Sequence, residues 1–303
     1  MKSNQILSSI SFLIACATII SCAKKETTYF GETPPGKTPA IFAPGVISTK
    51  DDFEFGAIFS KDLTEFYYGV FKDGKAETRM MKVEDGSWSE PKPILIHDVY
   101  SYNDPFLTPD ESKLFFISDQ PLDGQTSKKD YDIWYIERQS GGWSAPVNAG
   151  KNINSGKNEY YISFTSKGKM YFASNVADSL EKENYDIYSS ERVADEFQPS
   201  IQLDTAINSP YYEADVFVAP DESYLVFSAK RPDNLGSGDL YVSFRNPDNT
   251  WTIAQSLGNT INTETDDFCP YVSPDGKYLF YASRDDVYWV STEVITALRP
   301  VVQ

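Results

Sequence analysis

Histidine and cysteine are scarce in this chain of 303 residues. The one histidine, His97, leaves almost no room for a Ser-His-Asp triad or for a zinc site built from several histidines. The three cysteines are Cys16, Cys22 and Cys269, so two of them lie in the first 22 residues. No disulfide framework follows from this set, and the sequence points to no cofactor, although a structural or channel cation stays open.

Basic residues are also few. There are 27 Lys and Arg against 44 Asp and Glu, which gives a net charge of -17. This charge argues against a nucleic-acid partner and against electrostatic adhesion to anionic lipid. We therefore expect any contact with a membrane to be made through a lipid anchor alone.

The N-terminus lacks an apolar run long enough for a comfortable membrane span. Lys2 is followed by an apolar stretch over residues 6–20, which three serines interrupt and a polar segment follows. This pattern predicts an export signal over residues 1–21. The sequence Ile19-Ile20-Ser21-Cys22 resembles the lipobox of bacterial lipoproteins, in which the cysteine is lipidated.

Two alternatives to lipidation at Cys22 stay open. Cys16 also ends a lipobox-like segment, although cleavage there would leave two isoleucines in a linker that should be polar. A soluble secreted protein with incidental cysteines is the other alternative. Residues 22–40 lack apolar periodicity and contain Pro34-Pro35-Gly36, so we expect a flexible tether there, followed by one folded domain over residues 41–303.

Aromatic residues are abundant, at 15% of the chain, and they recur in a repeated pattern that is typical of strands. Each copy has a short apolar strand, a turn, an aromatic-rich strand and then a third strand. The copies align on five positions: Glu54, Tyr102, Glu159, Glu213 and Asp267. The spacings are 48, 57, 54 and 54 residues, and a period near 50 is typical of propeller blades.

This arrangement predicts an all-β, five-bladed β-propeller of four-stranded antiparallel sheets, with six blades as the alternative. The last copy lacks an outer strand of its own. Residues 41–47 match the corresponding segment near Ile261-Asn262 in composition and offset. We therefore expect the N-terminal strand to complete the last blade and to close the ring, which removes an exposed sheet edge.

The repeats resemble the WD40-like Pro-Asp repeat family of TolB-like β-propellers. The resemblance rests on Ser-Pro-Asp-Gly-Lys-Tyr-Leu-Phe-Tyr-Ala-Ser over residues 273–283 and on Asp-Ile-Tyr over residues 186–188. It covers about residues 41–298. The resemblance implies a propeller that serves as a binding platform in the bacterial envelope, in the periplasm or on the cell surface.

Acidic and aromatic residues recur at the start of the predicted inner strands, where a propeller places them near one mouth of its channel. The candidate ligand-binding residues are Glu54, Tyr102, Asp104, Glu159, Tyr161, Glu213, Asp215 and Asp267. Carboxylates among aromatic faces suit a sugar or a cationic ligand. The alternative, which the repetition favours, is that the aligned acids accept backbone N–H bonds and cap the inner strands. Metal binding is left undecided.

Taken together, these patterns predict a monomeric, lipid-anchored extracytoplasmic module that binds an envelope protein or a carbohydrate or peptide ligand. We expect no catalysis of its own. The alternative is a carbohydrate-active enzyme, a glycosidase or lyase, that uses carboxylates at the channel mouth. Such chemistry needs only two carboxyl groups, and Asp104 or Asp215 could supply them, although the sequence singles out no one pair.

Overall fold

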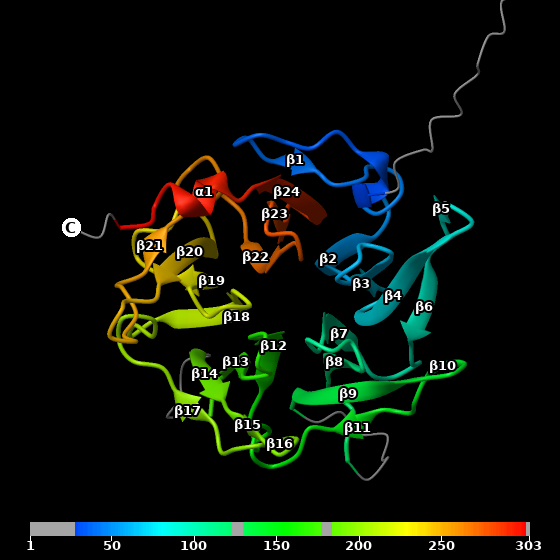
Figure 1. Cartoon of the computed structure of the whole chain (residues 1–303), viewed down its shortest axis with the longest axis horizontal. Helices are drawn as coiled ribbons and strands as arrows, with labels where there is room; N and C mark the ends of the chain where they lie inside the picture. The colour runs from blue at the N-terminus through cyan, green and yellow to red at the C-terminus, as the bar shows by residue number, and fades with distance from the viewer. Residues whose placement is uncertain (1–27, 123–129, 177–183, 301–303) are drawn as a thin grey trace, which may run out of the picture.

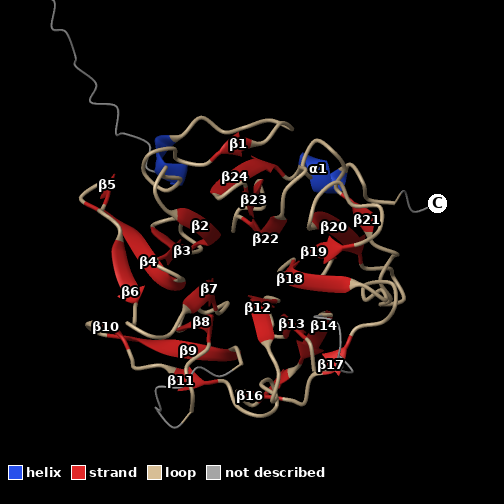
Figure 2. Cartoon of the chain, turned by 180° about the vertical axis from the view of Figure 1, so that it is seen from behind, coloured by secondary structure: helices blue, strands red, loops and turns tan. Residues whose placement is uncertain are grey.

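In the computed structural model, residues 28–122, 130–176 and 184–300 are described. The predicted signal peptide, the lipidation site Cys22 and the first part of the predicted tether lie outside these residues. The described chain forms five antiparallel sheets arranged around a central axis (Figures 1 and 2). The predicted five-bladed propeller is confirmed.

Each blade begins with an inner strand near the axis and continues outward. Blade 1 contains β2 (Phe53–Phe59), β3 (Glu65–Lys72), β4 (Lys75–Glu84), β5 (Ser87–Trp88) and β6 (Lys92–Leu95). Blade 2 contains β7 (Tyr102–Leu107), β8 (Lys113–Ser118), β9 (Asp132–Gln139), β10 (Gly142–Trp143) and β11 (Val147–Asn148). Blade 3 contains β12 (Glu159–Phe164), β13 (Met170–Ser174), β14 (Asp186–Ser190) and β17 (Ile201–Gln202), with a small hairpin of β15 (Arg192–Val193) and β16 (Glu196–Phe197).

The last two blades follow the same order. Blade 4 contains β18 (Tyr212–Val218), β19 (Tyr224–Lys230), β20 (Asp239–Phe244) and β21 (Gln255–Ser256). Blade 5 contains β22 (Asp267–Val272), β23 (Tyr278–Ser283) and β24 (Asp286–Ser291). The short helix α1 (Glu293–Thr296) follows β24. No helix of the described part is long and apolar enough to cross a membrane.

The N-terminal strand closes the ring. In β1 (Ala40–Ile41), Ala40 pairs with Trp289 and Ile41 with Tyr288 of β24, as Figure 1 shows. Phe42 is fully buried beside them, because its ring packs against Trp289 at 5.2 Å between centroids. The predicted closure is therefore confirmed, and the first and last parts of the chain share one sheet.

Residues 28–40, which belong to the predicted tether, include residues that contact the folded ring. Tyr29, in the 3-10 helix η1 (Thr28–Gly31), is only 4% exposed, and its hydroxyl donates a hydrogen bond to Asp275 at 2.7 Å. Phe30 stacks on Trp88 with ring centroids 4.2 Å apart. Sequence periodicity missed this segment because it is a single aromatic pair, which packs between blades without forming a regular element.

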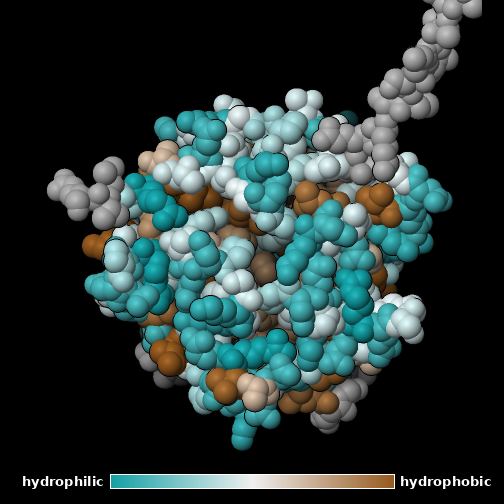
Figure 3. All heavy atoms as spheres, in the orientation of Figure 1, coloured by the Kyte–Doolittle hydropathy of each residue, from teal (hydrophilic) through white to brown (hydrophobic). Residues whose placement is uncertain are grey.

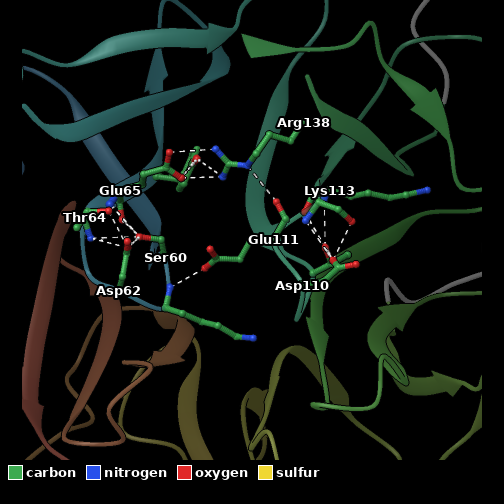
Figure 4. Close-up of polar contacts among 12 residues, drawn as sticks. Ser60, Asp62, Thr64, Glu65, Asp110, Glu111, Lys113 and Arg138 are labelled. Atoms are coloured by element: carbon green, nitrogen blue, oxygen red, sulfur yellow. Dashed lines mark hydrogen bonds and ion pairs between the residues drawn. The ribbon is translucent and has the colours of Figure 1, made fainter. Parts of the chain in front are cut away.

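In the turns between first and second strands, an Asp side chain binds a Ser or Thr two residues before it and another two residues after it. Asp110 accepts hydrogen bonds from the hydroxyls of Thr108 and Ser112 at 2.6 and 2.8 Å, and Asp62 accepts equivalent bonds in blade 1 (Figure 4). Such side-chain bonds satisfy turn groups that no strand can pair. Blades 1 and 2 are also joined across this region, where the Arg138 guanidinium donates to the Glu65 carboxylate at 2.7 Å.

The connections between blades use asparagine or serine to bind the third strand of the preceding blade. The backbone N–H donors and their acceptors are Ile133 with Asn154 at 2.8 Å, Ile187 with Asn208 at 2.7 Å, Leu240 with Asn262 at 2.8 Å and Val287 with the Ser48 hydroxyl at 3.2 Å. Ser48 belongs to the N-terminal segment. This segment therefore replaces a complete inter-blade connection as well as an outer strand.

Candidate ligand site at one mouth of the central channel

All five inner strands carry a β-bulge at the same place. The residue at the bulge has a positive φ in every blade: Gly56 at 58°, Asp104 at 50°, Tyr161 at 45°, Asp215 at 52° and Cys269 at 50°. Four of these are not glycine, and a left-handed backbone is unfavourable for such residues. A bulge turns a side chain away from the regular alternation of the strand. Here it directs one residue of each blade toward the axis.

Hydrogen bonds between these bulges cross the axis. The Tyr161 hydroxyl of blade 3 donates to the carbonyl of Pro270 in blade 5 at 2.9 Å, and Tyr161 is 2% exposed. The Cys269 thiol of blade 5 donates to the Asp104 carboxyl of blade 2 at 3.4 Å. Each of these bonds joins blades that are not neighbours, so side chains fill the channel at this level and leave a mouth at either end.

Burial changes the acid-base properties of this central layer. The pKa of Asp104 rises to about 7 because burial penalises its charge, an effect that the Cys269 thiol only partly offsets. The pKa of Asp215 rises to about 8 for the same reason, and the negative charges of Asp104 and Asp266 add to the increase. A hydrogen bond from the Cys269 backbone and the charge of Lys230 act in the opposite direction. Near neutral pH the Asp215 carboxyl is therefore mostly protonated, and the Asp104 carboxyl is about half protonated.

One mouth is a cavity of about 250 Å³ whose floor contains these carboxyl groups. Its lining residues are Phe53, Phe55, Phe71, Asn103, Asp104, Tyr160, Tyr212, Asp215, Phe268 and Cys269. The ring of Phe53 contacts those of Phe55 and Phe268 at 5.5 and 6.0 Å between centroids. Gly69 gives the Phe55 ring its space, because a Cβ at Gly69 would lie 2.8 Å from it. We call this cavity the aromatic mouth.

The four aligned acids lie elsewhere. Each accepts hydrogen bonds from a Ser or Thr four or five residues earlier: Glu54 from Thr49, Glu159 from Ser155, Glu213 from Ser209 and Asp267 from Thr263. In every case one donor is the backbone N–H of that residue. The acids are at most 1% exposed. They hold the connections between blades, as the capping interpretation expects, and they do not line the aromatic mouth.

The capping acids are also affected by burial, which is the first cause of each pKa change. It raises the pKa of Glu54 and of Glu159 to about 7, even though their hydroxyl and backbone donors lower it. Glu213 differs from the others, because the Arg231 guanidinium pairs with its carboxylate at 3.0 Å. These groups stabilise the ring and have no free face for a ligand.

The eight predicted site residues thus divide into the four capping acids, a central group and Tyr102. Asp104, Tyr161 and Asp215 are brought together in the central layer, whereas Tyr102 is buried and donates to the Gln120 side chain at 2.9 Å. The sequence analysis did not include Cys269 among the site residues. Cys269 lies two residues after Asp267, and this is the position in the repeat that Asp104, Tyr161 and Asp215 occupy in their own blades. Phe71 and Asn103 were missed because neither belongs to the aligned set.

The opposite mouth is a cavity of about 450 Å³ lined by the turns between first and second strands and by apolar side chains such as Phe106, Phe164 and Phe217. Within the described ranges, no group of three or more His, Cys, Asp or Glu side chains is placed to hold a metal ion. The face seen in Figure 3 is mainly hydrophilic, in keeping with the acidic composition.

Comparisons with known proteins bear on the fold. No family model matches the sequence, and no curated protein matches it. Among solved structures, the chain is similar to TolB from Acinetobacter baumannii at 14% identity and a TM-score of 0.52, covering 80% of this chain and 55% of that one. A Dyadobacter fermentans protein of unknown function is similar at 14% identity and a TM-score of 0.52, with 88% and 86% covered.

These likenesses define the class of the protein: it has the fold of a TolB-like β-propeller. The chain spans little more than half the length of the TolB chain that it resembles. At this level of identity the comparison shows the fold alone.

Proposed function

We propose that the chain is a non-catalytic, ligand-binding β-propeller, anchored in the bacterial envelope through a lipid on Cys22, and that the aromatic mouth is its binding site. The observation that carries this proposal is the combination, in one cavity, of aromatic walls and the carboxyl groups of Asp104 and Asp215. A concave site with apolar walls and a few polar groups is the usual form of a small-molecule site.

The polar groups of the aromatic mouth are only partly used by the protein. Within the described residues, the hydrogen bond to the Asp104 carboxyl comes from a thiol, which is a weak donor. The side-chain oxygen of Asn103 is buried and has no hydrogen-bond partner among the described residues. Unsatisfied buried acceptors are costly, so a ligand that supplies donors would be stabilised here.

A glycosidase is the second candidate, because Asp104 and Asp215 form a carboxyl pair in a cavity. Such an enzyme needs one protonated acid and one ionised carboxylate. Burial raises the pKa of both groups, so neither is favoured as the ionised nucleophile or base. We therefore expect no turnover of chromogenic glycosides or polysaccharides. Turnover that Asp104→Asn abolishes would establish the enzyme instead.

Ligand binding can be tested by thermal unfolding of the full chain carrying Cys22→Ser, in the presence of sugars, short peptides and organic amines. A ligand at one hundred times its Kd should stabilise the protein by about 2.7 kcal/mol. Phe268→Ala, which removes part of the wall, should abolish this effect. Asp221→Asn, an exposed carboxyl in a turn on the opposite face, should leave it unchanged. Stabilisation that survives Phe268→Ala, or none with any compound class, would contradict the proposal.

The lipid anchor has its own test. Mass spectrometry of the processed N-terminus should find a diacylglyceryl group on Cys22, and Cys22→Ser should move the protein from the membrane fraction to the soluble fraction. Lipid on Cys16, or membrane association that Cys22→Ser leaves intact, would contradict this part of the proposal.

A further inference from the structure

We infer that the aromatic mouth is built to hold an organic ammonium group, either a protonated amine or a quaternary ammonium. This inference rests on the proposed function and names the class of ligand. It depends on three features of the cavity: the carboxyl groups and missing basic side chains of its lining, its aromatic faces and its charge.

The first feature is the carboxyl groups and missing basic side chains of the lining. The lining contains the carboxyl groups of Asp104 and Asp215 and no Lys, Arg or His. Asn103 also lines the mouth, and its buried side-chain oxygen has no hydrogen-bond partner among the described residues. The side-chain donors of the lining are the Asn103 amide, the Tyr160 and Tyr212 hydroxyls and the Cys269 thiol, which is directed at Asp104, and none of them is positively charged. A sugar would offer donors and acceptors in similar numbers, whereas an ammonium group offers donors or positive charge alone.

The second feature is the set of aromatic faces. Six aromatic residues from blades 1, 3, 4 and 5 line the mouth: Phe53, Phe55, Phe71, Tyr160, Tyr212 and Phe268. A cation over an aromatic face gains about 0.5–2 kcal/mol, more where water is excluded. The Tyr212 ring already accommodates one cation, because Lys230 Nζ lies 4.7 Å from its centroid. Aromatic walls with a carboxylate at the floor are suited to an ammonium group whose own carbon substituents fill the apolar space.

The third feature is charge. The charged and titratable groups that face Asp104 and Asp215 are Asp266, Lys230, Cys269, Tyr160, Tyr161 and Tyr212. Lys230 is the one cation of this set, so an ionised floor is negative overall. In the absence of a ligand, burial holds protons on the two carboxyl groups. An ammonium group would favour the ionised form, so its binding should release a proton.

The experiment uses the full chain carrying Cys22→Ser and three probes: tetramethylammonium, tert-butyl alcohol as a neutral compound of similar shape, and maltose. Affinities are measured by calorimetry across the range from about pH 6 to about pH 9, which spans the pKa values of the floor carboxyl groups. Tetramethylammonium does not titrate, so any dependence on pH belongs to the protein.

We expect tetramethylammonium to bind at least about tenfold more tightly than tert-butyl alcohol, and its affinity to rise with pH by up to about tenfold per unit for each proton released. Asp104→Asn and Asp215→Asn should each weaken it by about tenfold or more and flatten the pH profile. Phe268→Leu keeps an apolar wall but removes a ring face, so it should weaken tetramethylammonium and spare tert-butyl alcohol. Asp221→Asn is the matched control and should change neither.

Equal binding of tetramethylammonium and tert-butyl alcohol, or an affinity unaffected by both Asp→Asn variants, would overturn the ammonium inference. Maltose binding that Phe268→Ala abolishes and the Asp→Asn variants preserve would overturn it too, but would leave the proposed binding function standing. Binding of none of the probes or other compound classes would overturn both. Variants that unfold at about pH 5 in one cooperative transition, at a temperature no lower than that of the parent, are scored as folded.

Discussion

The buried carboxyl of Asp104 should make the propeller less stable as the pH rises, and Asp104→Asn should remove that effect. In the unfolded chain this group loses its proton near its ordinary pKa of 3.8, whereas in the folded chain the pKa is about 7. Between these values the unfolded state binds fewer protons than the native state. The free energy of unfolding therefore falls as the pH rises, and the loss is complete above about pH 7.

The size of the effect follows from the change in pKa. An increase from 3.8 to about 7 corresponds to a loss of about 4 kcal/mol at high pH. Asparagine has the shape of the protonated acid and does not titrate. Near pH 5 the variant should therefore be more stable than the parent by only about 1.6 kcal/mol, because the unfolded parent is already ionised there, and at about pH 8.5 by up to about 4 kcal/mol.

The assay is urea denaturation followed by tryptophan fluorescence, because the chain has five tryptophans. Free energies are compared at several pH values between about 5 and 8.5 as the difference between variant and parent, which cancels the titrating groups that do not interact with Asp104. Asp104 also raises the pKa of Asp215, so Asp104→Asn should bring that pKa down. Asp221→Asn should follow the parent throughout. Parallel curves for Asp104→Asn and the parent would refute the reasoning.

Three further predictions concern the ring and the mouth. Tyr29→Ala should destabilise the protein by about 3–5 kcal/mol in urea denaturation, because it removes a buried ring that packs on Phe280 and Trp289; an unchanged midpoint would mean that this segment does not help to close the ring. Glu213→Gln should cost about 3–5 kcal/mol at neutral pH, since it leaves Arg231 without its buried partner, and more than Glu159→Gln, which breaks no ion pair; equal costs would contradict a stabilising role of the pair. Gly69→Ala should push the Phe55 ring into the aromatic mouth and lower the affinity for tetramethylammonium, and an unchanged affinity would show that Phe55 does not set the width of the mouth.

Much of the architecture could be predicted from the sequence because a propeller is built from local units. A copied hairpin and a regular spacing specify the blade and the number of blades. Even the closure of the ring was predicted, since residues 41–47 have the pattern that the last copy lacks. The turns could be predicted for the same reason, because the hydrogen bond from the Thr108 hydroxyl to Asp110 joins residues only two positions apart.

The candidate site could be predicted only in part. Glu159 is the first residue of β12 and Asp104 is the third residue of β7, so the two lie only two positions apart in the repeat. Only the bulge separates their roles, since Glu159 bonds back to its own connection and Asp104 reaches the axis. A β-bulge at a non-glycine residue has no clear sequence signal. The contact between Asp104 and Cys269, which lie 165 positions apart, could therefore not be predicted from the sequence.

The sequence by itself therefore determined the blade, the five copies and the strand that closes the ring, because each depends on periodicity and on contacts between near neighbours. Only the tertiary structure decided which residues meet on the axis, that Tyr161 closes the channel and that Tyr29 and Phe30 belong to the folded ring. These outcomes depend on five separate strands arriving at one place, and no local pattern records how they meet.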